Sequence, residues 1–476
     1  MARDIERPQP IDSFLNVRDY GAVGDGHSLD SPAVQQAIDS LRESGGGTVY
    51  FPAGTYLCGT IVLTDNITLH LDAGAVLVES YRDGLQTAVV STIGAENRAR
   101  PHLIHAANAR NISICGYGEI HGRGASDDVG TDMRERGFRT GIIYLVDCIG
   151  VKLRDFTIRH GDSWTVHMHG CEEVFIHGIS VLNNLFRCGG NDGLDINCCR
   201  NVMISNCRIE AWDDCIVLKT KDRDQVDDAV TKTCENVVVT NCVLRSGCTA
   251  LKIGSETKGA FRDIHFNNCT IRDSSVGFGI YLLDGAMVER VSCTNVSMEI
   301  ISDDRYRRNR GPHFLHIWPF CVFIDRRTPR SRLGRIRDLT LRDIQACSDF
   351  GAVILGNAEN PIENLTLDNI TLRVRKCVPY FPRLLPCHPA GLEDGDRIDR
   401  ESLSDDAFRI IPARPSDLPK YRPAYLNIEH VTDLSFRDLS VYLTDEAATD
   451  NNRVALSIEN VKDSQVHKAG RWRVAV

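Results

Sequence analysis

The sequence lacks long apolar runs, a basic excess and many aromatic residues, which make up only 7% of the chain. No segment approaches the roughly 18 consecutive apolar residues of a membrane-spanning helix, so we expect no membrane anchor. The opening MARDIERPQP has no apolar core after its charges, which predicts no secretory leader and favours a cytoplasmic location. Lys and Arg number 55 against 64 Asp and Glu, a net charge of −9. This balance argues against a nucleic-acid partner.

Cysteine is abundant, with 18 residues, but it lacks the patterns of a disulfide or metal role. Disulfide frameworks are typical of short secreted chains, and neither CxxC pairs nor zinc-like His/Cys spacings occur. Instead Cys207, Cys242 and Cys269 each follow an Asn, in NVMISNCRI, NVVVTNCVL and DIHFNNCTI. We therefore expect inert thiols packed in the interior, and neither a metal nor a cofactor.

The Asn-Cys segments belong to a longer repeat. Val202, Val237, Ile264 and Val291 begin successive copies that are 35, 27 and 27 residues apart. Each copy is a short alternating strand, an Asn or Asp corner and a second short strand. A period of about 20–50 residues is typical of solenoids. With almost no helical periodicity between the strands, the pattern predicts an all-β fold, a parallel β-helix that forms one domain over residues 1–476.

Two regions depart from this repeat. Residues 31–44 place apolar side chains on one helical stripe, with Asp30 or Ser31 as the N-cap; the stripe consists of Ala33, Val34, Ala37, Ile38 and Leu41. We expect a short helix that covers the open N-terminal end of the solenoid, within a cap of about residues 1–60. Residues 376–425 hold eight of the 17 prolines and an acidic run, and predict a long irregular insertion.

Carboxylates supply the first indication of chemistry. Asp192 lies 21 residues before Asp213, close to one rung, so it should neighbour the Asp213–Asp214 pair. Adjacent strand residues point to opposite faces, so both members of the pair reach one cleft only at a bend. Crowded carboxylates repel, which raises at least one pKa. Glycoside hydrolysis uses one protonated and one ionised carboxyl; a calcium site and solvated turns remain alternatives.

Several segments, taken in order and spacing up to about residue 375, carry a family resemblance. They are NVRDYGAVGDG, GGGTVYFPAGTY, LHLDAGAVL, SWTVHMHGC, DGLDI, WDDCIVLKT, LKIGS and GIYLLDGAMVERV. Together they resemble glycoside hydrolase family 28, the polygalacturonase-like, pectin-lyase-type right-handed parallel β-helices. The resemblance implies that Asp213 is the general acid and that Asp192 and Asp214 position and deprotonate water. It also implies a single displacement that inverts the anomeric carbon.

The sequence departs from this family at three blocks. Gly190 stands where the family has Asn, and Thr249, within Cys248-Thr249-Ala250, replaces its His. Its Arg-Ile-Lys block reads Tyr281-Leu282-Leu283, which removes both cations that grip a galacturonate carboxylate. We therefore do not expect an ordinary polygalacturonase.

Other side chains are candidates for holding the sugar. Lys252 follows the acidic pair by one rung and is placed to reach the cleft, and Trp318 is either a stacking platform or a core residue. The full set of predicted substrate-binding residues is Lys252, Tyr281, Thr249, His167 and Trp318. The loop over residues 303–335, with the Arg-rich DDRYRRNR, is either an overhang of the cleft or a solvated loop.

These observations favour a glycoside hydrolase with a pectin-related oligosaccharide or polysaccharide as its partner. Two other hypotheses stay open. One is a uronate lyase or epimerase on the same fold, in which Tyr281 and Lys252 act near the sugar carboxylate. The other is a non-catalytic carbohydrate-binding β-helix.

Overall fold

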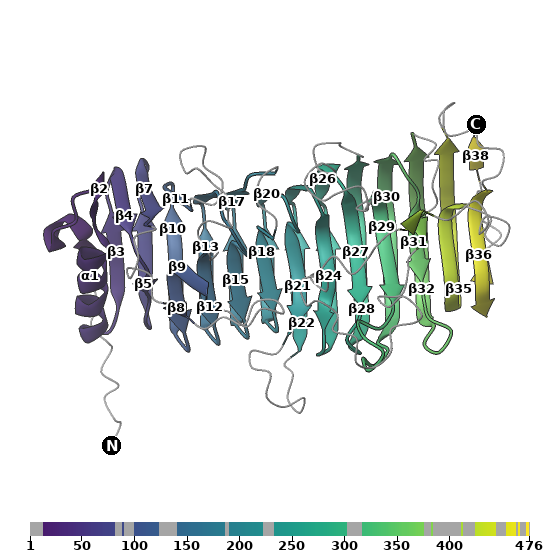
Figure 1. Ribbon diagram of the computed structural model, residues 1–476, viewed down its shortest axis with the longest axis horizontal. Coiled ribbons are helices and arrows are strands. Elements are labelled where there is room, and N and C mark those ends of the chain that lie inside the picture. The colour runs from purple at the N-terminus through teal and green to yellow at the C-terminus, as the bar shows by residue number, and fades with distance from the viewer. Residues whose placement is uncertain are drawn as a thin grey trace, which may run out of the picture.

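The computed structural model is a single long stack of parallel β-strands (Figure 1). Nearly every strand pairs with the strand one rung before it and one rung after it. The residues that it describes are 13–80, 88–89, 100–122, 140–185, 190–221, 233–301, 317–375, 382–383, 411–412, 424–443, 454–462, 465–466 and 473–475. The predicted parallel β-helix is confirmed.

The stack has three faces, which we call faces 1, 2 and 3 in the order in which the chain first forms them. Face 1 contains β1 (Phe14–Asn16), β3 (Gly47–Phe51), β6 (Ile67–Leu71), β10 (Arg110–Gly116), β13 (Ile149–Arg154), β16 (Glu172–His177), β19 (Arg200–Ser205), β22 (Cys234–Thr240) and β25 (Phe261–Asn267). Face 2 contains β2 (Asp25–Leu29), β4 (Gly54–Cys58), β7 (Ala75–Glu79), β11 (Glu119–His121), β14 (Thr157–Arg159), β17 (Ser180–Leu182), β20 (Arg208–Ala211), β23 (Val243–Ser246) and β26 (Thr270–Ser274).

Face 3 carries most of the polar side chains discussed below. It contains β5 (Ile61–Val62), β9 (Arg100–Ala107), β12 (Gly141–Val146), β15 (Val166–His169), β18 (Leu194–Asn197), β21 (Ile216–Thr220), β24 (Thr249–Thr257), β27 (Val276–Leu282), β29 (Trp318–Ile324) and β31 (Ala352–Leu355). β8 (Ala88–Val89) pairs antiparallel with β9.

Later rungs run around the corners without a break. β28 (Met287–Ile300), β30 (Arg335–Ser348) and β32 (Ile362–Val374) continue from face 1 into face 2, and β35 (Ala424–Leu443) passes through all three faces. The last strands pair with β35; they are β36 (Val454–Lys462), β37 (Gln465–Val466) and β38 (Arg473–Ala475).

Alternation within each strand builds the core. The repeat positions Val202, Val237, Ile264 and Val291 pair in register on face 1, as the repeat predicted, and all four are buried. Because equivalent residues lie about 4.8 Å apart on successive rungs, apolar side chains stack directly on one another. One continuous apolar column therefore fills the interior.

The Asn-Cys segments turn the corner between faces 1 and 2. Asn206, Asn241 and Asn268 adopt left-handed backbone angles, with φ of 56°, 57° and 53°, which Asn tolerates better than most residues. The cysteine after each Asn points inward and is buried. Both the Asn corner and the interior packing of these thiols are confirmed.

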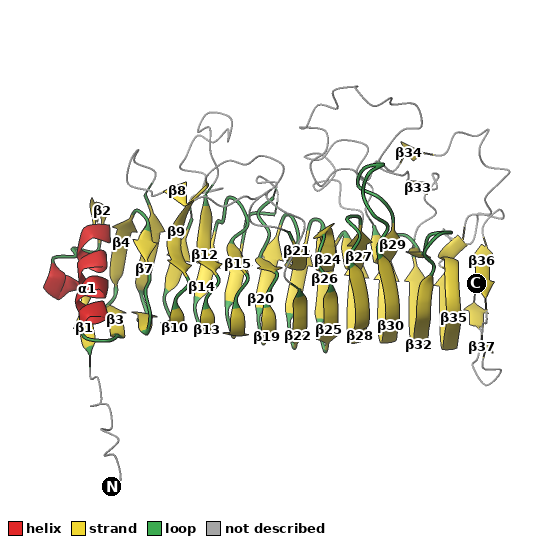
Figure 2. Ribbon diagram, turned by 90° about the horizontal axis from the view of Figure 1, so that it is seen from below, coloured by secondary structure: helices red, strands yellow, loops and turns green. Residues whose placement is uncertain are grey.

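The N-terminal end of the stack is covered by α1 (Ser31–Glu43), which follows the 3-10 helix η1 (Val17–Tyr20) (Figure 2). The predicted stripe faces the core, with Val34, Ala37, Ile38 and Leu41 buried. Asp30 occupies the N-cap position, but its side chain does not cap α1. Its carboxylate instead accepts hydrogen bonds from the Val23 and Gly24 amides, at 2.6 and 3.2 Å.

Two predicted loops lie partly outside the described residues. Of the loop predicted over residues 303–335, residues 303–316 lie outside the described residues, but Trp318–Ile324 form β29, so the loop prediction is wrong there. The other is the insertion over residues 376–425, of which the structure describes the antiparallel pair β33 (Pro382–Arg383) and β34 (Ile411–Pro412) and the start of β35. Within the described ranges, no helix is both long and apolar enough to cross a membrane.

Candidate active site

The three predicted aspartates meet where two successive rungs enter face 3. Asp192 lies just before β18, and Asp213 and Asp214 lie in the bend between β20 and β21. The Gly193 amide donates to the Asp214 carbonyl oxygen at 2.8 Å, and the Trp212 amide donates to Asn191 Oδ1 at 3.0 Å. The backbone therefore holds the rungs side by side, and the bend that the adjacent pair required is present.

These aspartates are not solvated turn residues. Asp192 and Asp214 are each only 2% exposed, whereas Asp213 is partly exposed. Asp213 Oδ2 accepts a hydrogen bond from the Gly190 amide at 3.1 Å, so the residue that replaces the family Asn still contacts the site through its backbone. The solvated-turn alternative is wrong for Asp192 and Asp214. Asp213 is the most exposed of the three carboxyls.

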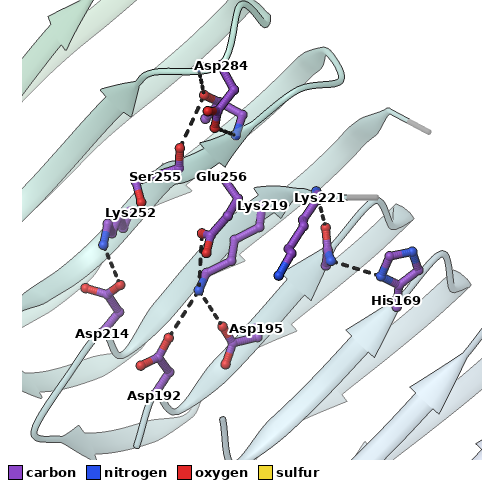
Figure 3. Close-up of polar contacts among 12 residues, drawn as sticks. His169, Asp192, Asp195, Asp214, Lys219, Lys221, Lys252, Ser255, Glu256 and Asp284 are labelled. Carbon is purple, nitrogen blue, oxygen red and sulfur yellow. Dashed lines mark hydrogen bonds and ion pairs between the residues drawn. The ribbon is translucent and has the colours of Figure 1, made fainter. Parts of the chain in front are cut away.

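Lys219, on β21, is a site residue that sequence reasoning missed. Its ammonium lies 3.5 Å from Asp192 Oδ2, 3.2 Å from Asp195 Oδ1 and 3.6 Å from Glu256 Oε2 (Figure 3). Period-two alternation was a usable indication, because Ile216 and Leu218 fill the interior and Lys219 must therefore point outward. The same alternation places Asp195 on the outer side of β18.

Lys252, on β24, reaches the site as predicted. Its ammonium contacts Asp214 Oδ2 at 2.8 Å, and both side chains are almost fully buried. It also lies 5.0 Å from the centre of the Tyr281 ring. The Thr249 amide donates to Asp214 Oδ1 at 3.2 Å, and the Thr249 hydroxyl lies 3.3 Å from that of Tyr281. Three of the predicted substrate-binding residues therefore surround Asp214.

Burial and charge crowding set the protonation of the carboxyls. Burial raises the pKa of Asp192 well above its usual range, and the nearby Asp195 and Asp213 charges add to this rise. Burial also raises the pKa of Asp195 to about 7, although Lys219 opposes the change. The pKa of Asp214 is raised by burial and held down by Lys252. Protonated and ionised carboxyls therefore coexist here near neutral pH.

His167 lies beside the carboxylates on the preceding rung, paired in register with Asp195. Its ring stacks on Tyr144 with centroids 4.7 Å apart and meets Trp164 edge-on at 5.0 Å. Burial and neighbouring positive groups lower its pKa well below the usual value, so the ring is neutral at physiological pH. Within the part of the chain that the structure describes, neither ring nitrogen has a hydrogen-bond partner.

Trp318 does not line this site. Its side chain is 1% exposed, belongs to the apolar core and packs edge-on against Phe350 at 4.9 Å. Because no face of the indole is free to meet a sugar, the stacking interpretation is corrected in favour of a core residue. Tyr281 stacks on Phe323 at 4.9 Å, and Leu282 and Leu283 are fully buried. Lys219 and Lys252, from other blocks, supply the positive charge of the site.

One group of donor atoms is close enough to share a cation. Among the described residues, ligand atoms of Asp213, Asp214 and Cys248 lie within 4.8 Å of one another. Carboxylates and a thiolate are able to hold a metal together. The Lys252 ammonium, however, already contacts Asp214 Oδ2 and competes with a cation for that oxygen.

Known proteins match parts of this chain. A family model described as rhamnogalacturonase A/epimerase, pectate lyase-like, matches residues 14–117. A probable polygalacturonase of Vitis vinifera is 29% identical over 278 residues, covering 55% of this chain and 55% of that protein. An exo-poly-alpha-D-galacturonosidase of Dickeya chrysanthemi is 25% identical over 316 residues, covering 56% and 52%. The chain thus spans about half the length of the curated relatives that it matches.

The fold also matches solved structures. The family 28 exopolygalacturonase of Yersinia enterocolitica superposes with a TM-score of 0.64 at 19% identity, over 96% of this chain and 78% of that one. At this identity the likeness shows the fold alone, a right-handed parallel β-helix. The sequence matches and the fold together confirm the resemblance to the polygalacturonase-like proteins of family 28.

Proposed function

We propose that this protein hydrolyses glycosidic bonds in a pectin-related oligosaccharide or polysaccharide. The observation that carries the proposal is the meeting of Asp192, Asp213 and Asp214 from two successive rungs, with burial that differs between them. Hydrolysis with inversion needs a carboxyl that donates a proton and another that accepts one. Burial and repulsion raise the pKa of Asp192 and Asp214, and Lys219 and Lys252 oppose that rise, which favours the ionised form that a proton acceptor needs.

In this proposal Asp213 is the general acid, the role that the resemblance to family 28 implies for it, and it is the most exposed of the three carboxyls. Its proton passes to that oxygen as the glycosidic bond breaks. Asp192 and Asp214 hold a water molecule on the opposite side of the sugar, and the proton of that water passes to a carboxylate as its oxygen bonds to the anomeric carbon. The product is inverted in one step.

The proposed substrate is pectin-related because the sequence relatives are named for polygalacturonate-degrading activities. The name of the Dickeya relative also supports release of units from a chain end. Because Tyr281, Leu282 and Leu283 bring no cation, we propose a substrate other than plain polygalacturonan.

The test is reducing-sugar release from a panel of pectic and non-pectic oligosaccharides. We expect the wild-type protein to release sugar from a pectic member, and Asp213→Asn to lower the rate by at least about 100-fold, the usual contribution of a general acid. The matched control is Asp343→Asn, the same chemical change at an exposed corner far along the stack, which should keep full activity. Proton NMR of the first product should show the inverted anomer.

The same panel separates the other two hypotheses. A lyase would produce an unsaturated uronate that absorbs in the ultraviolet, and an epimerase would change sugar composition without cutting the chain. The high pKa of the buried Tyr281 phenol disfavours that residue as the base of either reaction. Sugar binding without any product, in both wild type and Asp213→Asn, would contradict the hydrolase and favour a carbohydrate-binding protein.

A further inference from the structure

The side chain of Lys219 is almost fully buried, and its ammonium group lies among carboxylates. The residue is 1% exposed, and its nitrogen lies within 3.6 Å of carboxylate oxygens from Asp192, Asp195 and Glu256. These three groups come from two different rungs, before and after β21. A buried charge is costly unless it is paired. The charged Lys219 ammonium is therefore stable here only if at least one of the carboxyls beside it is ionised.

An aromatic ring fixes where the ammonium lies. Lys219 Nζ is 3.5 Å from the centre of the Trp164 indole, a cation–π contact that is stronger when both groups are desolvated. Trp164 in turn meets the His167 ring edge-on. The indole therefore limits the movement of Lys219 away from the carboxylates and holds it between Asp192 and Asp195.

The charges around Lys219 do not balance. Lys252 is engaged with Asp214 on the next rung, which leaves Lys219 to compensate Asp192, Asp195 and Glu256. The other charged or titratable groups that face this cluster are Asp213, Asp214, His167, His169 and Lys221. Among the residues that the structure describes, carboxyls therefore outnumber ammonium groups in this cluster.

We infer that Lys219 is a positioning residue, whose ammonium, held by Trp164 beside Asp192 and Asp195, favours the ionised form of Asp192. This inference rests on the proposed function, in which Asp192 accepts a proton from water. Asp195 is then a second carboxyl that shares the Lys219 ammonium with Asp192. Lys219 lowers the pKa of both carboxyls and so opposes the rise that burial and the Asp195 charge cause in the pKa of Asp192.

Two variants test this inference because they should act in opposite directions. Lys219→Met keeps the apolar stem and removes the charge, which should raise the carboxyl pKa and move the acidic limb of kcat/KM upward by about 1–3 pH units. Asp195→Asn keeps the shape and removes a like charge, which should move the same limb downward. Lys219→Arg restores the charge and should return the limb toward its wild-type position.

A second readout needs no substrate. Infrared titration of the protonated carboxyl band in each folded variant should show the same opposite shifts. If no oligosaccharide is hydrolysed, the proposed function fails while this titration still decides the role of Lys219. If Lys219→Met does not fold, as judged by circular dichroism, Lys219→Gln takes its place, because it also removes the charge and keeps a polar end group. Shifts in one common direction, or no shift in the folded variants, would overturn the inference.

Discussion

The Lys252–Asp214 pair offers a test in which stability depends on pH in a predictable direction. The ammonium and the carboxylate are 2.8 Å apart, with side chains only 5% and 3% exposed. Lys252→Met removes the charge and leaves Asp214 buried beside the other acidic groups. Breaking a buried pair from one side typically costs about 3–5 kcal/mol, because the remaining charge has no partner.

That cost should shrink in acid. Burial raises the pKa of Asp214, and Lys252 holds it down, so loss of Lys252 raises it further. When the pKa of a carboxyl is higher in the folded state than in the unfolded state, the protein becomes less stable as the pH rises toward the folded-state pKa. When the pH is lowered, Asp214 of the variant therefore becomes protonated and no longer carries an unpaired charge. We therefore expect the full cost of about 3–5 kcal/mol near pH 8 and well under half of it near pH 5.

The assay is equilibrium urea unfolding of the full chain at both pH values, followed by circular dichroism. Lys252→Met/Asp214→Asn should regain most of the stability, because it removes both charges and keeps an oxygen for the Thr249 amide. The control is Lys152→Met at an exposed position, where we expect a change within about 0.5 kcal/mol. Equal losses at both pH values, or a double variant no better than the single one, would refute the reasoning.

The stacked interior and the corners give two further expectations. Phe266 and Phe278 are fully buried and meet edge-on at 5.8 Å, so Phe266→Ala should lower the free energy of unfolding by about 3–5 kcal/mol. Truncating the exposed Met203 should change that free energy little, and urea unfolding measures both variants. Asn268 has φ of 53° and accepts a hydrogen bond from Asn295 at 2.7 Å, so Asn268→Ala should shift the unfolding midpoint by more than Asn268→Gly, which tolerates that backbone angle. Equal shifts from Ala and Gly would contradict a conformational cause.

The fold was predictable because several independent sequence patterns recur with the same period. Alternating apolar residues, an Asn before each inward Cys, and Val202, Val237, Ile264 and Val291 at the head of each copy all indicate the same rung. The capping helix was predictable from its stripe. The hydrogen bonds of the Asp30 side chain were not predictable, because an acidic residue before a helix can also accept from amides outside that helix. Here the Asp30 carboxylate accepts from the Val23 and Gly24 amides instead of capping α1.

The sequence predicted the acidic part of the site and the three residues around Asp214, which are Thr249, Lys252 and Tyr281. The spacing of Asp192 and Asp213 matches one rung, so their meeting follows from the period. Lys219 was missed because a lysine at the end of an apolar strand is usually solvent-facing, and its burial depends on groups from neighbouring rungs. Trp318 was predicted to be a substrate-binding residue but belongs to the core. A single aromatic residue on a strand does not reveal which side it faces unless the alternation around it is regular.

Because every rung touches only the rungs beside it, the length of the protein and the layout of its site can change independently. Duplicating a whole rung beyond β31 would lengthen the stack and leave each atom around Lys219 where it is. Inserting one between β18 and β21 would move Asp192 away from Asp214 by about 4.8 Å, one strand spacing. Such a fold lets evolution extend the molecule at its ends while the rungs that carry the carboxylates stay fixed as a unit.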